Sequence, residues 1–230
     1  MTIAIDRREF IRSHTSLLSP PLVPEVTLHL AHEAPPIWQK TEEDLGEIGL
    51  PPPFWAFAWA GGQALARYVL DNRGIVEDKS VIDLASGSGL VAIAAMKAGA
   101  SSVLAADIDS FSVAAIAINA ALNNVRVEAT PRDLLESDPP PSDVILVGDL
   151  FYEKSLAARC LEWLEMAELQ GTQVLIGDPG RSYLPKERLE KIAEYSVPVS
   201  RDLEDAEIKR AAVWRLAMCN THASTKRGKP

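Results

Sequence analysis

The sequence is poor in cysteine, because Cys160 and Cys219 are the only two among 230 residues. Two cysteines form no disulfide framework, and these two do not have the spacing of metal ligands. Histidine is also scarce: of the four, only His29 and His32 lie close together, with no cysteine nearby to complete a ligand set. We therefore predict no metal site and a reducing, cytoplasmic setting.

Long apolar segments and an excess of positive charge are missing as well. No run approaches the roughly 20 apolar residues of a membrane-spanning helix, and residues 1–16 lack the apolar centre of a secretory signal. The chain has 23 Lys and Arg against 32 Asp and Glu, a net charge of −9. We therefore expect neither a membrane nor a nucleic-acid partner, because phosphate contacts require clustered Lys and Arg. An acidic body suits a basic or lysine-bearing partner instead.

The most informative stretch is residues 81–89, which read Val-Ile-Asp-Leu-Ala-Ser-Gly-Ser-Gly. Its apolar first half is typical of a strand that is buried on both faces, and a tight turn follows. Helix-forming residues begin directly after Gly89. A strand, a glycine turn and a helix N-terminus form a nucleotide-binding crevice at the carboxyl edge of a parallel sheet. Gly87 and Gly89 lack Cβ atoms, so a ligand can lie against the backbone there.

Two kinds of nucleotide cofactor fit this crevice. Residues 87–92 match G-x-G-x-x-A, which would suit a dinucleotide. Asp83, however, precedes the glycines, where a carboxylate would meet a cationic ligand better than a pyrophosphate. The stretch resembles motif I of class I S-adenosylmethionine-dependent methyltransferases, with Ala85, another small residue, where the first glycine is common. The alternative is an ordinary βα turn that binds no ligand.

The rest of the chain alternates strands with helices, which predicts right-handed βαβ units and a parallel sheet. An early helix is expected over residues 6–18, a half-buried strand over 26–30, a third sheet strand over 125–129 and a late helix over 186–193. Two final strands, 195–199 and 211–216, should pair antiparallel. With the resemblance, this gives an α/β, Rossmann-like seven-stranded methyltransferase sheet with helices on both faces. We divide the chain into an N-terminal extension packing on the core (1–53), the methyltransferase domain (54–220) and a flexible basic tail (221–230).

Candidate cofactor ligands stand where predicted strands end. Asp107 follows the glycine turn by roughly 20 residues, the interval at which an acid reaches ribose hydroxyls; it could also be a solvated loop acid. Asp133 resembles the position that holds the adenine amino group, with Leu134 covering the ring, although a helix N-cap is the alternative. Trp59 belongs to an aromatic run before Gly61-Gly62. That run either lines a pocket or starts a helix packed on the core.

The second informative motif is Asp149-Leu150-Phe151-Tyr152, after the fourth strand. Base- and amide-modifying methyltransferases carry Asn-Pro-Pro-Tyr or close variants there, and this chain lacks those prolines. The motif resembles the Asp/Glu-x-x-Tyr/Phe signature of seven-β-strand protein lysine methyltransferases. That resemblance implies that Asp149 attracts and aligns the lysine nitrogen while Tyr152 forms the channel wall. The alternative is a structural Asp near the start of the next helix.

The resemblance extends to the flanks of the domain. Residues 54–67, 177–181 and 212–216 are similar to segments of the electron transfer flavoprotein β-subunit lysine methyltransferases. This resemblance implies that S-adenosylmethionine is the cofactor and that the β subunit of electron transfer flavoprotein is the substrate. The turn from Asp178 to Arg181 could line the substrate side or form a loop salt pair. The competitors are a methyltransferase of a ribosomal protein or small amine, a nicotinamide oxidoreductase, and a non-catalytic relative that binds a partner.

Overall fold

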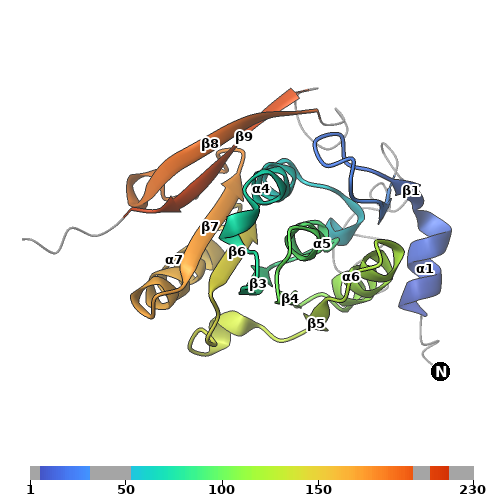
Figure 1. Ribbon diagram of the computed structural model, residues 1–230, viewed down its shortest axis with the longest axis horizontal. Coiled ribbons are helices and arrows are strands. Elements are labelled where there is room, and N and C mark those ends of the chain that lie inside the picture. The colour runs from blue at the N-terminus through green and yellow to red at the C-terminus, as the bar shows by residue number, and fades with distance from the viewer. Residues whose placement is uncertain (1–5, 32–52, 199–207, 218–230) are drawn as a thin grey trace, which may run out of the picture.

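The protein is built around a mostly parallel seven-stranded sheet in a computed structural model that describes residues 6–31, 53–198 and 208–217. The strand order is β5-β4-β3-β6-β7-β9-β8 (Figure 1). The strands are β3 (Ser80–Leu84), β4 (Ser102–Ala106), β5 (Glu128–Thr130), β6 (Val144–Gly148), β7 (Gln173–Asp178), β8 (Leu189–Pro198) and β9 (Ile208–Leu216). Strands β3 to β7 pair in parallel, whereas β9 is antiparallel to both β7 and β8. The predicted sheet with an antiparallel C-terminal pair is confirmed.

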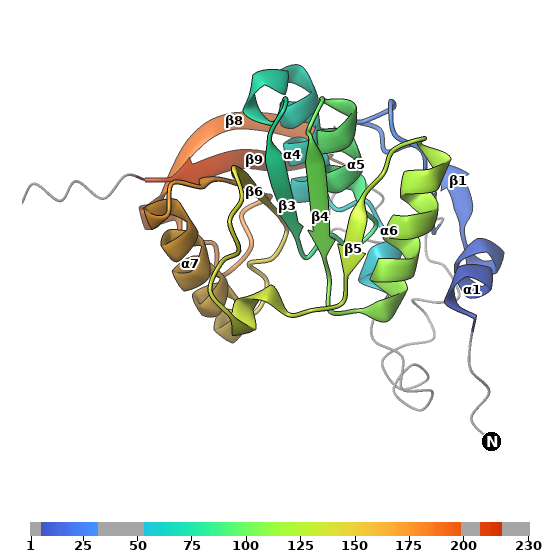
Figure 2. The same cartoon turned by 60° about the horizontal axis from the view of Figure 1, so that its bottom comes forward.

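Helices cover both faces of this sheet. Helices α4 (Ala60–Asp71), α5 (Leu90–Lys97) and α6 (Ser110–Leu122) pack on one face, and α7 (Lys154–Leu169) packs on the other (Figures 1 and 2). In β6, Val144 and Leu146 belong to the first core, while Ile145 and Val147 belong to the second. Central strands read as continuous apolar runs because both of their faces are buried.

The sheet reverses its order beside β3. From β3 the chain proceeds outward to β4 and β5, and then returns to place β6 on the other side of β3. Ligands of open α/β sheets bind at the carboxyl ends of the strands beside such a reversal. The crevice predicted after Leu84 therefore lies where β3 and β6 end side by side.

The helix predicted over residues 186–193 is wrong. Only Lys186–Arg188 form a single 3-10 turn, and the chain then continues as the long strand β8. Strand β8 pairs with β9 from Leu189↔Leu216 to Pro198↔Ile208, with one irregularity between Lys191 and Ala193. Pairing with a strand that follows later in the sequence outweighs the local helix propensity of this segment.

The amino-terminal elements also differ from the expectation. Helix α1 spans Arg7–His14 rather than residues 6–18, and the next residues form β1 (Ser16–Leu18), which pairs antiparallel with β2 (Leu28–Leu30). The third sheet strand, expected over 125–129, is confined to β5.

Several expectations fall outside the described residues. The tail over 221–230, Cys219 and His32 are among them. None of the helices in the described ranges is long and apolar enough to span a membrane.

Candidate active site

A cavity of about 620 Å³ opens at the carboxyl ends of β3, β4 and β6. It brings together most of the residues that the sequence singled out: Trp59, Gly87, Asp107, Asp133, Leu134, Asp149 and Tyr152 line it. Asp83 and Gly89 are not among its lining residues. No group of three or more potential metal ligands occurs within the part of the chain that the structure describes.

The glycine turn uses its two glycines for different purposes. Gly87 has φ +54°, and an added Cβ would meet only the Phe54 carbonyl oxygen, at 3.9 Å, so its backbone faces open space. Gly89 has φ +84°, but an added Cβ would lie 3.3 Å from Ile116 in α6. Gly89 therefore allows close helix packing. Ala85 also has a positive φ, +55°, a backbone conformation that costs a non-glycine residue about 1–2 kcal/mol.

Asp83 is buried, with 1% of its surface exposed, and it contacts the glycine turn from the protein interior rather than from the cavity. Its Oδ2 accepts hydrogen bonds from Ser86 Oγ at 2.5 Å and from the backbone N–H of Ala92 at 2.9 Å. Ala92 is the third residue of α5, whose N-cap Gly89 has no side chain to cap it. Asp83 supplies that missing cap. Burial raises its pKa to about 7, and the nearby Asp107 adds to the rise.

Asp107 links the end of β4 to the glycine turn. Its Oδ2 accepts from the Gly87 N–H at 2.8 Å, and its Oδ1 accepts from the Asp109 N–H at 2.9 Å. Burial raises the pKa of this carboxyl. Since a carboxylate has about four acceptor positions, two such bonds leave capacity for ligand hydroxyls in the cavity.

Asp133 is both an N-cap and a lining residue. Its Oδ1 accepts from the Leu135 N–H at 3.0 Å and caps a 3-10 turn, while its Oδ2 pairs with Arg159 Nη2 at 3.0 Å. The N-cap alternative therefore describes part of what Asp133 does. Leu134, the next residue, is buried against the cavity. Sequence reasoning missed Arg159, which comes from the middle of α7, where an Arg carries no motif signal.

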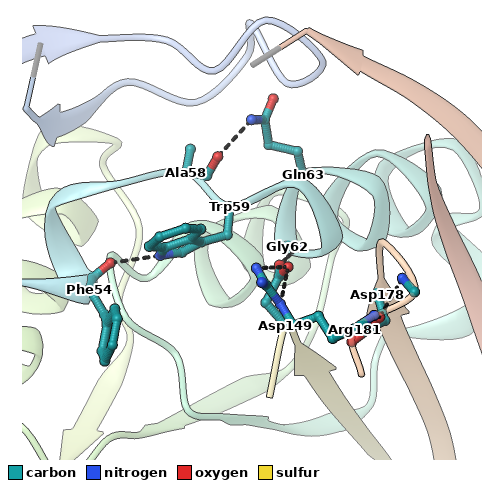
Figure 3. Close-up of polar contacts among 9 residues, drawn as sticks. Phe54, Ala58, Trp59, Gly62, Gln63, Asp149, Asp178 and Arg181 are labelled. Carbon is teal, nitrogen blue, oxygen red and sulfur yellow. Dashed lines mark hydrogen bonds and ion pairs between the residues drawn. The ribbon is translucent and has the colours of Figure 1, made fainter. Parts of the chain in front are cut away.

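An aromatic wall closes one side of the cavity. The Trp59 ring N–H donates to the Phe54 carbonyl at 3.0 Å (Figure 3). The Phe54 ring lies 6.1 Å from the Trp59 ring and 5.8 Å from the Tyr152 ring, centroid to centroid. Tyr152 is 48% exposed. Trp55 and Phe57 instead lie in the core. The run thus contributes both to the pocket and to packing.

Asp149 lies at the inner end of this wall and is only 8% exposed. Its Oδ2 accepts from the Gly62 N–H at 2.7 Å, and its Oδ1 accepts from Arg181 Nη2 at 2.7 Å and Nε at 3.2 Å (Figure 3). Burial raises the pKa of Asp149 to about 6, and the Arg181 guanidinium opposes this rise. The helix that follows, α7, is capped by Glu153. The alternative role of Asp149, as a structural residue at the start of α7, is therefore not what the structure shows, because its carboxylate caps α4 instead.

Close glycine contacts bring α4 to Asp149. A Cβ on Gly61 would lie 2.3 Å from the Gly177 carbonyl oxygen, and one on Gly148 would lie 3.2 Å from Gly62 Cα. The start of α4 therefore lies directly on the ends of β6 and β7. Only this close approach lets the Gly62 N–H reach the Asp149 carboxylate.

The turn after β7 positions Arg181. Asp178 is buried, and its Oδ1 accepts from the N–H groups of Gly180 at 2.6 Å and Arg181 at 2.7 Å. The Arg181 guanidinium carbon lies 5.5 Å from the centre of the Trp59 ring. Arg181 lines the cavity and forms a salt bridge with Asp149, outside the turn, whereas Asp178 binds backbone N–H groups.

Comparison with known proteins places this geometry in a family. Residues 63–148 match the family model of ribosomal protein L11 methyltransferase (PrmA). The electron transfer flavoprotein beta subunit lysine methyltransferase of Xenopus laevis is 39% identical over 219 residues, which are 93% of this chain and 88% of the relative. The protein of the same name from Danio rerio is 37% identical over 217 residues, 91% of this chain and 83% of the relative.

The chain belongs to the electron transfer flavoprotein beta subunit lysine methyltransferase family. It is thus a methyltransferase, as the resemblance predicted, and this membership counts against the oxidoreductase and non-catalytic alternatives. The match to the L11 methyltransferases ends at residue 148, directly before Asp149. That model therefore covers the glycine turn but not the Asp149–Tyr152 motif.

Solved structures support the fold. The SMU.776 protein, solved in complex with SAH (S-adenosylhomocysteine), has a TM-score of 0.50 and 11% identity, covering 69% of this chain and 50% of that protein. At this identity the likeness concerns the fold alone.

Proposed function

We propose that the protein transfers a methyl group from S-adenosylmethionine to a lysine side chain of the β subunit of electron transfer flavoprotein. The observation that carries this proposal is the Asp149 carboxylate, set at the inner end of an aromatic wall that opens to solvent through Tyr152. Relatives matching some nine-tenths of the chain carry that substrate in their names. The acidic body of the protein suits a lysine-bearing partner.

The cavity residues fit the proposed cofactor. The cavity volume of about 620 Å³ lies within the usual range for small-molecule sites. Asp107 would accept the ribose hydroxyls, Asp133 would accept from the adenine amino group, and Leu134 would cover the ring. Gly87 offers open backbone beside them. When bound, the cofactor supplies an electrophilic methyl group.

Two of the proposed cofactor residues act indirectly in this scheme. Asp83 and Gly89 position the turn and the start of α5 rather than lining the cavity. Trp59 lines the cavity and contacts both Phe54 and Arg181, two residues at the lysine end, so it would meet the cofactor at that end.

The chain's own residues would promote transfer mainly by positioning. Asp149 would align the lysine nitrogen through its remaining acceptor positions. Tyr152, with Phe54, would hold the aliphatic stem of the lysine by apolar contact. No dedicated general base is assigned, because the lysine proton can leave to solvent.

The test is a transfer assay with labelled S-adenosylmethionine and purified β subunit, read by mass spectrometry as gains of one or more methyl groups on lysine. We expect transfer by the wild-type protein and none by Asp149→Ala. Ribosomal protein L11 serves as the comparison substrate, because the L11 methyltransferase model matches residues 63–148. Methylation of L11 but not of the β subunit would overturn the proposed substrate. Calorimetry with S-adenosylhomocysteine beside NAD tests the cofactor, and binding of NAD alone would overturn it.

We also propose that residues 1–53 form an extension that packs on the core. In its support, the Leu22 N–H donates to Gln63 Oε1 at 3.3 Å, and the His29 N–H donates to Asn119 Oδ1 at 2.8 Å. The cytoplasmic setting stays a prediction; its support is the low cysteine content, with Cys160 a free, buried thiol.

A further inference from the structure

Arg181 is held by contacts with three residues. Its backbone N–H is bound by Asp178, its guanidinium carbon lies over the Trp59 ring, and its Nε and Nη2 both donate to Asp149 Oδ1. Its side chain is 20% exposed, and it lines the cavity beside Asp149. The Asp178 bond fixes the backbone of Arg181, and the contacts with Trp59 and Asp149 fix its guanidinium, so this cation is held in place at the site.

This arrangement changes what Asp149 can do for a lysine. A bare buried carboxylate would attract a protonated ammonium and keep it protonated, because an opposite charge within a few ångströms favours the charged form. Here one oxygen already carries the guanidinium, and the other carries the N–H at the positive end of α4. An arriving ammonium would therefore meet a pair with almost no net charge, and a cation beside it.

Among the described residues, the further charge that acts on Asp149 is Asp178, which raises the Asp149 pKa. Asp178 is itself engaged by two backbone N–H groups, and Lys186 lies near enough to lower the pKa of its carboxyl. Among the described residues, Asp107 and Glu153 also raise the pKa of Tyr152, and the Arg181 guanidinium lowers it. The pKa of Tyr152 is raised chiefly by burial, so this phenol stays neutral near pH 7.

We propose that Arg181 is a positioning residue that makes the site select the uncharged form of the substrate lysine. It neutralises Asp149, so that the carboxylate accepts an N–H from the neutral amine instead of stabilising the ammonium. This inference rests on the proposed lysine methyltransferase activity.

The proposal accounts for the proton in the transfer. The lysine ammonium loses one proton to solvent as it enters the site, which leaves a lone pair on nitrogen. The nitrogen donates this pair to the methyl carbon, the new C–N bond forms, and the C–S bond breaks with its electrons remaining on sulfur. Only the neutral amine has the lone pair, so a site that disfavours the ammonium raises the reactive fraction. An ordinary lysine has a pKa of about 10.4, which makes this fraction small near neutrality.

The test is the pH dependence of kcat on the β subunit for wild type, Arg181→Met and Arg181→Lys, between pH 7.5 and 10. The methionine keeps an unbranched stem over Trp59 without the charge, whereas the lysine keeps the charge. We expect Arg181→Met to lose about tenfold or more in kcat at pH 7.5, since one pKa unit corresponds to a factor of ten. The deficit should shrink to about twofold near pH 10. Arg181→Lys should restore most of the activity at pH 7.5.

Arg159→Met is the matched control, because Arg159 also lines the cavity and pairs with an aspartate, Asp133. Its kcat profile should keep the wild-type midpoint, whatever its effect on cofactor affinity. A deficit in Arg181→Met that is the same at every pH, or an equal loss in Arg181→Lys, would mean that Arg181 only maintains the local structure. Either result overturns the proposal.

A second measurement needs no substrate and separates the two proposals. Carbon-13 NMR titration of the Asp149 carboxyl should show its pKa about one unit or more higher in Arg181→Met than in wild type, because a cation near a carboxylate lowers its pKa. If the β subunit is not methylated, the proposed substrate fails while this titration still judges the Arg181–Asp149 pair. An unchanged Asp149 pKa would refute the neutralised pair.

Discussion

The Gly62 backbone N–H donates to Asp149 Oδ2 at 2.7 Å across 87 residues of sequence. Gly62 is the third residue of α4, so the carboxylate at the substrate end of the cavity is also the cap of that helix. Asp83 does the same for α5 at Ala92. Both helices begin at residues without a capping side chain of their own, and both receive their cap from a buried aspartate at a strand end.

Asp149→Ala should abolish methyl transfer while leaving the affinity for S-adenosylhomocysteine within about threefold of wild type. It should also lower the free energy of unfolding by about 2 kcal/mol, because it removes a helix cap and leaves the Arg181 guanidinium without its carboxylate. Transfer assays, calorimetry and urea unfolding measure the three effects. Glu190→Ala, which removes an exposed carboxylate paired with Arg215, is the control and should change none of them. Normal turnover in Asp149→Ala would remove Asp149 from the site.

Asp107→Ala should weaken cofactor binding by about ten- to a hundredfold, since hydrogen bonds to a charged group contribute about 1.5–3 kcal/mol each. Calorimetric titration with S-adenosylhomocysteine measures this change. The variant should still transfer methyl groups when the cofactor is saturating, because Asp149 and Tyr152 are intact. An unaltered dissociation constant would count against contact with the ribose.

Asp83→Asn should alter the pH dependence of stability. The folded-state pKa of Asp83, about 7, lies above the ordinary value of 3.8 because of burial. The folded protein therefore binds the Asp83 carboxyl proton more tightly than the unfolded chain does. The free energy of unfolding that this proton contributes is lost as the pH rises from about 4 to about 7. Relative to wild type, Asp83→Asn should gain stability over that window, by at most about 1.4 kcal/mol per pH unit. Urea unfolding at pH 5, 6, 7 and 8 tests this, and a constant difference would contradict the raised pKa.

Gly61→Ala and Gly177→Ala should each destabilise the protein severely. In both cases the added Cβ would lie within 2.3 Å of a backbone oxygen, a contact that only movement of α4 against β7 can relieve. Overpacking of this kind costs about 1–3 kcal/mol or more. Gly74→Ala is the matched control, because nothing lies within 4 Å of its added Cβ. Thermal unfolding should separate the control from the other two, and three equal melting temperatures would contradict the close contact.

Ala85→Gly should stabilise the protein by about 0.5–1 kcal/mol. Relief of the positive φ outweighs the greater chain entropy that glycine brings to the unfolded state. Ala98→Gly is the control: Ala98 has φ −79°, where glycine brings the entropy cost without relief. Chemical denaturation measures both, and a loss of stability in Ala85→Gly would show that the turn does not strain alanine.

The central fold could be predicted because its signals are local. A buried strand, a glycine turn and a helix follow one another within residues 80–97, and each central strand is an apolar run. Strand β8 was mistaken for a helix because its identity depends on pairing with β9 rather than on its own residues. The same holds in the site. The N-cap role of Asp133 was foreseen from neighbouring residues, whereas the bonds of Asp149 to Gly62 and Arg181 arise only when distant segments pack together.

Strand β9 is the last strand of the described chain, yet it lies inside the sheet, between β7 and β8. A chain leaving the ribosome therefore exposes the open edge of β7 until residues 208–216 have emerged. A product truncated before residue 208 would keep that edge, and β8 would also lack its partner. Unpaired edges invite pairing with other chains, so such fragments should aggregate and be degraded.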